Sequence, residues 1–111
     1  MMTLAQKHCV PCEGGVPKLD KVQAIEQLKQ LKDWQLNEEA TTITKHYTFK
    51  DYYRTMAFIN AVAWIAHNEN HHPDMIFSYN TCEVSYHTHA IGGLSENDFI
   101  CAAKVDQLAY L

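Results

Sequence analysis

Histidine is the residue type in this sequence best suited to chemistry, and its distribution is uneven. Five of the seven histidines fall between positions 67 and 89, namely His67, His71, His72, His87 and His89. An unperturbed imidazole has a pKa of about 6.5, so it both donates and accepts protons near neutral pH. No nucleophilic serine motif and no glycine-rich phosphate loop accompanies them. The cluster therefore favours proton transfer as the chemistry.

The expected secondary structure brings these side chains together. We expect His71 at the C-terminal end of a helix and His72 in the turn that Pro73 enforces. A helix C-terminus favours a protonated histidine by about 0.3–1 kcal/mol, which makes His71 a candidate acid. His87 and His89 are two positions apart in a predicted strand, so they are expected on the same face. Taken singly, a histidine such as His71 or His46 is more often a surface residue or a hydrogen-bonded structural residue, and only the group favours catalysis.

A metal site is the first alternative. His67 and His71 stand four apart on the predicted helix, and His89 could supply a third ligand. Zinc proteases with this spacing need a glutamate directly after the first histidine. That position is Asn68 here, and Glu69 follows one residue later, about 100° further around the helix. We therefore expect no metal.

Two of the four cysteines, Cys9 and Cys12, form a pair near the N-terminus. A structural zinc site usually needs a second such pair, and the sequence has none. Capture of a metal there, with His8, is the minor alternative. We expect reduced thiols in a segment that is either poorly ordered or simply packed on the domain.

The apolar periodicity predicts seven elements. They are a helix over 20–32 with Asp20 as N-cap, strands over 34–36 and 41–49, a helix over 51–70, strands over 75–79 and 82–91, and a helix that Ser95 caps and that runs to about 109. Two hairpins separated by a helix indicate an α+β fold, a four-stranded antiparallel sheet with three helices on one face.

The helix over 51–70 carries more apolar surface than one core face requires. One stripe consists of Tyr52, Met56, Ile59, Ala63 and Ala66, and a second consists of Phe58, Val62 and Ile65. We expect one face on the sheet and the other against a partner, so the chain is predicted to form a homodimer or homotetramer.

Length and net charge limit the number of domains and the classes of partner that this chain is expected to have. The chain has 111 residues, which suits an N-terminal arm over 1–18 and one domain over 19–111. The net charge is −4 without a basic run, which disfavours direct binding to nucleic acid. No apolar run approaches the roughly 20 residues that span a bilayer. We expect a soluble, cytoplasmic protein.

Several short motifs resemble one known family. They are Asn70-His71-His72-Pro73-Asp74, Tyr79-Asn80, Thr88-His89 and Gly93-Leu94-Ser95-Glu96-Asn97-Asp98, with Trp34, Phe49-Lys50-Asp51-Tyr52 and Phe58 upstream. Over about residues 20 to 110 the chain resembles the pterin-4a-carbinolamine dehydratases. The resemblance implies dehydration of a 4a-hydroxytetrahydropterin to the quinonoid dihydropterin, without a metal or cofactor.

The resemblance also implies roles for individual residues. His71, His72 and His89 correspond to the acid–base set, with the donor and the acceptor left open. Asn70, His87, Thr88 and Ala90 fall where the family lines its substrate pocket, partly through backbone groups. Asp98 matches a family aspartate, although Ser95 and Asp98 also have the spacing of a helix capping box. A binding module with a regulatory protein partner is the alternative from another class, since family members also act as such partners.

Overall fold

Two antiparallel hairpins build the sheet in the computed structural model, which describes residues 2–11 and 16–108. Strands β1 (Gln35–Leu36) and β2 (Ile43–Thr48) form the first, and β3 (Asp74–Phe77) and β4 (Thr81–Tyr86) form the second. β2 pairs with β4, so the strand order is β1-β2-β4-β3. The helices are α1 (Lys21–Leu28), α2 (Tyr52–Glu69) and α3 (Glu96–Asp106). The predicted α+β class and the order α-β-β-α-β-β-α are confirmed.

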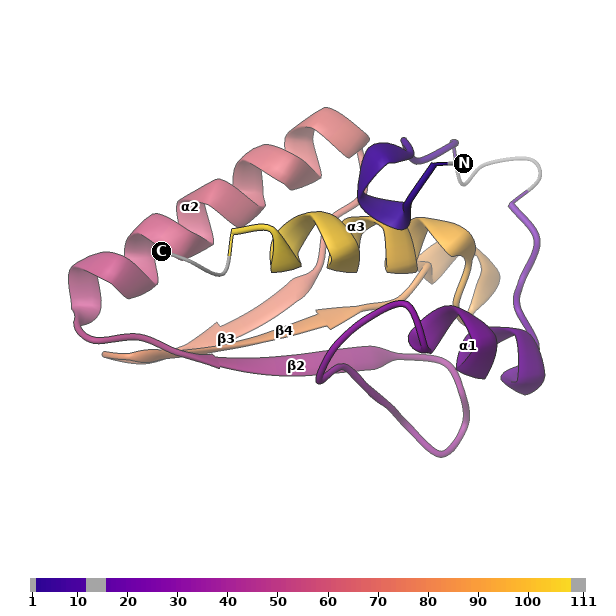
Figure 1. Cartoon of the computed structure of the whole chain (residues 1–111), viewed down its shortest axis with the longest axis horizontal. Coiled ribbons are helices and arrows are strands. Elements are labelled where there is room, and N and C mark those ends of the chain that lie inside the picture. Colours follow the sequence, from indigo (N-terminus) through magenta and orange to yellow (C-terminus); the bar gives the residue numbers. More distant parts are fainter. Residues whose placement is uncertain (1, 12–15, 109–111) are drawn as a thin grey trace.

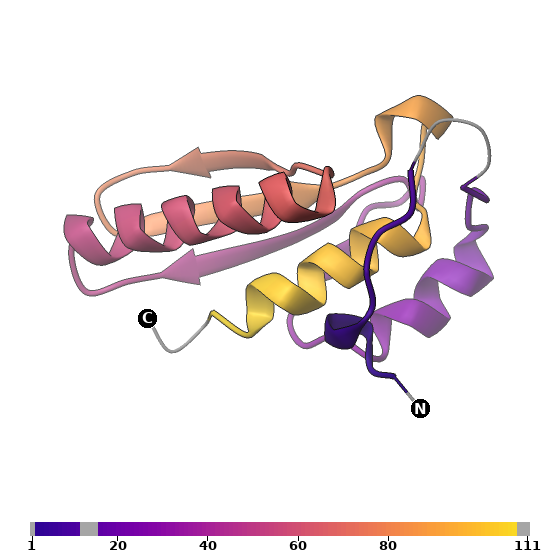
Figure 2. The same ribbon diagram turned by 90° about the horizontal axis from the view of Figure 1, so that it is seen from above.

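The helices form a layer over the sheet. Figures 1 and 2 show α2 and α3 over the same face, with α1 beside α3. Ile43 of β2 and Val84 and Tyr86 of β4 are fully buried beneath this layer, and Phe58 of α2 and Phe99 of α3 are buried against them. None of the helices in residues 2–11 and 16–108 combines the length and apolar character needed to span a bilayer.

The stripe of α2 that contains Phe58 faces the core, and Ile59 of the other stripe is partly buried against it. Phe58 and Val62 are fully buried, whereas Tyr52 on the other stripe is 43% exposed and Ala63 is also exposed. Trp64, which belongs to neither stripe, is 65% exposed. The outer side of α2 therefore keeps apolar surface beyond what the core uses.

Local capping sets the starts of the helices as predicted. The Asp20 carboxylate accepts a hydrogen bond from the N–H of Gln23 at 2.8 Å, and Ser95 is the N-cap of α3. The first helix is four residues shorter than predicted. Beyond Leu28 the bonds run to the third preceding carbonyl, as from the Leu31 N–H to the Leu28 oxygen, so the helix tightens into a turn.

The strand predicted over 82–91 is wrong in its second half. β4 ends at Tyr86, and His89–Ile91 forms a 3₁₀ turn, η2. Thr88 pairs instead with Gly93, whose carbonyl accepts the Thr88 N–H at 2.7 Å. Gly92 closes the turn with a positive φ of 63°, which glycine adopts without steric cost. His87 and His89 therefore do not share a strand face.

The sequence left two alternatives for the N-terminal arm, a poorly ordered segment or a segment packed on the domain. Residues 2–11 are packed on the domain. The short turn η1 (Leu4–Gln6) lies against α3, with Leu4 only 4% exposed in the core. The Lys104 ammonium of α3 donates to the Ala5 carbonyl at 2.8 Å. Cys12, the second cysteine of the predicted pair, lies outside the described residues.

Candidate active site

A cavity of about 910 Å³ lies where α2 ends, at the turn that follows β4. Its walls are Pro11, Asn70, His71, His72, Asp74, His87, His89 and Ala90. The three histidines predicted as acid–base groups all contribute. Asn70, His87 and Ala90 of the predicted substrate-binding set contribute as well. Thr88 is not one of the lining residues; it is fully buried behind the wall.

The end of α2 places the side chain of His71. Asn70 is the C-cap in the left-handed conformation, with φ 51° and ψ 43°, which asparagine tolerates better than most residues. The N–H of His71 bonds to the Ala66 carbonyl at 3.2 Å, and Pro73 then leads the chain into β3. The His71 ring is 7% exposed and stacks on Tyr86, with ring centroids 5.9 Å apart.

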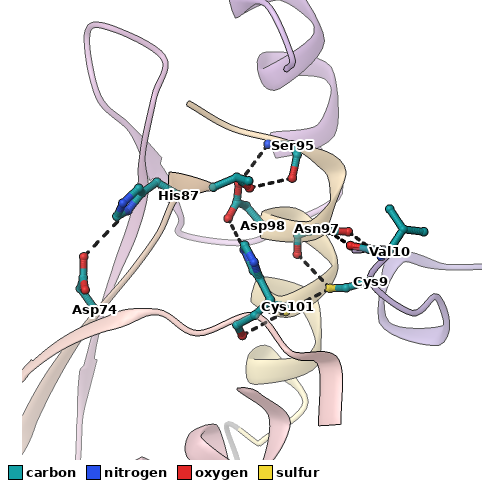
Figure 3. A network of polar contacts seen from close by, with 10 residues as sticks. Cys9, Val10, Asp74, His87, Ser95, Asn97, Asp98 and Cys101 are labelled. Atoms are coloured by element: carbon teal, nitrogen blue, oxygen red, sulfur yellow. Dashed lines mark hydrogen bonds and ion pairs between the residues drawn. The ribbon is translucent and has the colours of Figure 1, made fainter. Parts of the chain in front are cut away.

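Asp98 is the buried partner of His71. The Nε2 atom of His71 lies 2.6 Å from Oδ1 of Asp98, which is fully buried in the first turn of α3. The other oxygen, Oδ2, accepts from the Ser95 N–H at 3.0 Å and from the Thr88 hydroxyl at 2.7 Å. Figure 3 shows the carboxylate of Asp98 at the centre of these contacts. Helix capping and support of the site therefore use different oxygens of one side chain.

The hydrogen-bond directions follow from the number of protons available. The single hydroxyl proton of Thr88 goes to Asp98, so the hydroxyl of Ser95 donates to Oγ1 of Thr88 at 2.7 Å. An ionised Asp98 accepts only, so the proton between it and His71 resides on Nε2. In the neutral ring the lone pair is then on Nδ1. Asp98 thereby fixes which ring nitrogen of His71 carries the proton in the neutral ring.

The other histidines of the cavity are more accessible. His72 and His89 are exposed, and His87 is half-buried. The rings of His87 and His89 meet edge to face with centroids 5.8 Å apart. Nδ1 of His87 lies 3.8 Å from Oδ2 of Asp74. The turn after β4 therefore brings His87 and His89 to the same cavity, although they do not share a strand face.

Pro11, Asp74 and Tyr86 were not assigned to the site from the sequence. Asp74 lies in the motif that begins at Asn70, which could have pointed to it. Tyr86 alternates with half-buried positions as a core residue of a strand does, and Pro11 lies in a segment without periodicity. Neither sequence pattern could have shown that Tyr86 packs on His71 or that Pro11 lines the cavity.

The residues of the alternative metal site point to different places. The ring of His67 packs on Trp64 at 5.8 Å, and His67 is not a lining residue of the cavity. Glu69 accepts the Cys9 N–H at 2.7 Å and contacts Nδ1 of His8 at 2.9 Å. Within residues 2–11 and 16–108, no three histidine, cysteine or acidic side chains converge in a metal-binding group.

Glu69 is held as an anion by the N-terminal arm. Burial by itself would raise the pKa of this carboxyl. The hydrogen bonds from the Cys9 N–H and His8, with the charge of Lys104, outweigh that effect and lower the pKa below its ordinary value. Glu69 therefore serves as an anchor for the arm.

The comparisons with known proteins point to one family. The family model for pterin 4 alpha carbinolamine dehydratase matches residues 17–108. The chain belongs to this family. Residues 2–11 precede the matched region, so the packed arm is an addition to the fold that the family model describes.

Relatives within the family extend the match to most of the arm. A protein of Nitrosomonas eutropha, provisionally named a pterin-4-alpha-carbinolamine dehydratase, is 62% identical over 106 residues, which is 95% of this chain and 92% of its own. A protein of Nitrosospira multiformis with the same provisional name is 58% identical over 105 residues, again 95% of this chain and 91% of its own.

Two solved structures share the fold. The first is described as a transcriptional coactivator/pterin dehydratase of Brucella melitensis, with a TM-score of 0.80, 30% identity and coverage of 84% of this chain and 99% of that one. The second is a pterin dehydratase-like protein identified as a RuBisCO assembly factor in the alpha-carboxysome. It has a TM-score of 0.61, 25% identity and coverage of 70% of this chain and 90% of that one.

The cysteines of the described residues should differ in reactivity. A hydrogen bond with Cys9 and burial raise the pKa of the Cys101 thiol, and burial raises the pKa of Cys82 to about 11. Alkylation requires the thiolate, so iodoacetamide at pH 8 is expected to modify Cys9 well before Cys82 or Cys101. Peptide mass mapping over time measures this order. Equal labelling of Cys101 and Cys9 in folded protein would contradict the packing of the arm on α3.

Proposed function

We propose that this chain dehydrates 4a-hydroxytetrahydropterin to quinonoid dihydropterin, by histidine acid–base catalysis. The reaction would recycle the pterin used by aromatic amino acid hydroxylases in the cytoplasm. The observation that carries the proposal is the contact of 2.6 Å between His71, at the cavity wall, and the fully buried Asp98. Membership of the family supports the substrate class.

The proposed reaction needs two proton movements and no electron transfer. A proton goes to the 4a-hydroxyl, the carbon–oxygen bond breaks and water leaves, while the proton on N5 is removed so that a carbon–nitrogen double bond forms. The hydrogen bond from Nε2 to Asp98 orients the His71 ring at the cavity wall, so we assign His71 to the removal of the N5 proton. His89 and His72, at the open side of the cavity, are then the donors to the hydroxyl.

The remaining wall of the cavity suits a small, flat, polar heterocycle. Its volume lies in the range typical of small-molecule sites, roughly 300–1,000 Å³. Asn70, His87 and Ala90 are proposed to bind the pterin, partly through backbone groups. Thr88 acts indirectly in this proposal, because its hydroxyl bonds to Asp98. We propose that no metal or cofactor takes part.

The test is the rate of dehydration of 4a-hydroxytetrahydropterin generated in place by a hydroxylase. The spontaneous rate, measured without the protein, is subtracted because this compound loses water unaided. Acceleration by the wild-type protein supports the proposal. A rate equal to the blank, with folded protein, would overturn it and favour a binding role such as that named for the two structural neighbours.

We further propose that the protein forms a homodimer or homotetramer. β3 is an edge strand of the sheet, and it and the turn after it expose Ile76 by 69%, Phe77 by 47% and Tyr79 by 61%. The outer side of α2 adds Trp64 and Tyr53, which is 83% exposed. An apolar edge strand that carries such side chains is usually covered by another chain.

Replacing Ile76 by lysine is expected to shift the protein towards smaller species, because a charge at an apolar interface opposes association. Analytical ultracentrifugation over a range of concentrations measures the shift. Val22→Lys is the matched control, since Val22 is 71% exposed on α1, away from β3 and α2. A wild-type protein that stays monomeric at every concentration would contradict this proposal.

A further inference from the structure

The N-terminal arm attaches to two helices, next to the two members of the His71–Asp98 pair. The Cys9 N–H donates to Oε1 of Glu69 at 2.7 Å, and Glu69 is two residues before His71. The Val10 N–H donates to Oδ1 of Asn97 at 3.1 Å, and Nδ2 of Asn97 donates back to the Val10 carbonyl at 2.8 Å. Asn97 directly precedes Asp98. Consecutive residues of the arm thus hold both sides of the pair.

These attachments are shielded from solvent. Asn97 is 2% exposed, and the side chain of Glu69 is 6% exposed. The sulfur of Cys9 lies 3.4 Å from that of Cys101, which in turn lies 4.0 Å from the carbonyl oxygen of His71. Figure 3 shows Cys9 and Val10 against the side of α3 that carries Asn97 and Cys101. Pro11, the next residue, reaches the cavity wall.

The pair needs such support because its members come from separate elements. His71 lies beyond the last turn of α2, and Asp98 lies in the first turn of α3. A hydrogen bond of 2.6 Å between them tolerates little displacement of either helix end. The Cα atoms of residues 9 and 10 are about 3.8 Å apart, as across any trans peptide. Their bonds to Glu69 and Asn97 therefore hold the two helix ends at a set spacing.

We infer that residues 8–11 position the acid–base pair, with Glu69 and Asn97 as the positioning residues through which the arm fixes the geometry of His71 and Asp98. The inference rests on the proposed function for its effect on rate, but its structural part does not. The arm precedes residues 17–108, the region that the family model matches.

The test compares two substitutions at one exposed arm position. Val10→Pro removes the N–H that Asn97 accepts and leaves α2 and α3 unchanged in sequence. Val10→Ala keeps that N–H and is the matched control, since the Val10 side chain is 57% exposed. Asn97→Ala removes the same contacts from the α3 side. Asn37→Ala is a stability control, because it breaks three side-chain hydrogen bonds in the β1–β2 turn, remote from the pair.

The first readout is the Nε2 proton of His71, observed by NMR in the full-length protein without substrate. Its hydrogen bond to Asp98 protects it from exchange with water. We expect Val10→Pro and Asn97→Ala to speed this exchange and to lower kcat between about 10- and 100-fold, the loss that a misplaced catalytic group causes. Val10→Ala and Asn37→Ala should leave both quantities within about twofold of the wild type, since they leave the arm contacts intact.

An unchanged exchange rate in folded Val10→Pro would overturn the inference. The same change in Val10→Ala as in Val10→Pro would overturn it as well, since the N–H would then be irrelevant. Because the exchange rate is read without substrate, it is independent of whether the protein is a dehydratase. Faster exchange in a protein without dehydratase activity would support the positioning role while the proposed function fails.

Discussion

Replacing His71 by alanine is expected to lower the catalysed rate of pterin dehydration by about 10²- to 10⁴-fold. The reason is that a buried carboxylate, Asp98, lies 2.6 Å from Nε2 of His71, so the substitution removes the acid–base group that this carboxylate orients. The fold should persist, because Asp98 keeps the Ser95 N–H and the Thr88 hydroxyl as donors. Rates with the spontaneous reaction subtracted, together with circular dichroism, measure both effects.

His46→Ala is the matched control for this substitution. His46 is exposed on β2, where Nε2 lies 3.4 Å from Oε1 of Glu83, and it is not a lining residue of the cavity. Its removal should change the rate by less than about twofold, because no group near the cavity moves. A folded His71→Ala protein with the wild-type rate would refute the assignment of His71 to the acid–base chemistry.

Replacing Asp98 should affect both stability and rate. Asp98→Ala leaves three buried donors without their acceptor, those of His71, Thr88 and Ser95. Each buried donor that loses its acceptor typically costs about 1–3 kcal/mol, and we expect a loss of several kcal/mol in the free energy of unfolding. Urea denaturation followed by fluorescence or circular dichroism measures it.

Asp98→Asn separates the two effects, because it keeps the size of the side chain. The amide has one acceptor oxygen and an NH₂ group where the carboxylate accepted from three donors. The NH₂ group facing His71 would favour the tautomer with the lone pair on Nε2 and the proton on Nδ1. A histidine in the wrong tautomer is a poor base, and we expect a rate loss of about 10²- to 10⁴-fold with a smaller loss of stability.

The ¹⁵N chemical shifts of His71 report the tautomer directly, and the dehydration assay reports the rate. Ser78→Ala is the control, because it also removes a side-chain hydrogen bond, the one between the hydroxyls of Ser78 and Thr81, but in the exposed β3–β4 turn. An Asp98→Asn protein that dehydrates the pterin at the wild-type rate would show that the carboxylate serves only as a helix cap.

Local signals in the sequence accounted for most of the fold. The N-caps Asp20 and Ser95 and the apolar periods define elements through interactions within a few residues, so they can be read from the chain alone. The end of β4 could not be read in this way. It depends on the pairing of Thr88 with Gly93, and the run from Cys82 to Ile91 carries no sign of that contact.

The sequence by itself pointed to the histidines of the cavity wall, because their motifs are short and contiguous. Asn70 and Ala90 were expected there only from the family resemblance, and Asp74 and Pro11 were not predicted. It did not show that the carboxylate oxygens of Asp98 are divided between the helix cap and His71. The hydrogen bond between His71 and Asp98 joins positions 27 residues apart, so it forms only when α2 and α3 pack together. The arm is the extreme case: Val10 meets Asn97 across 87 residues, through backbone groups that every residue except proline carries. Tertiary structure alone could reveal that contact, because a backbone hydrogen bond leaves no mark on the residue type that donates it.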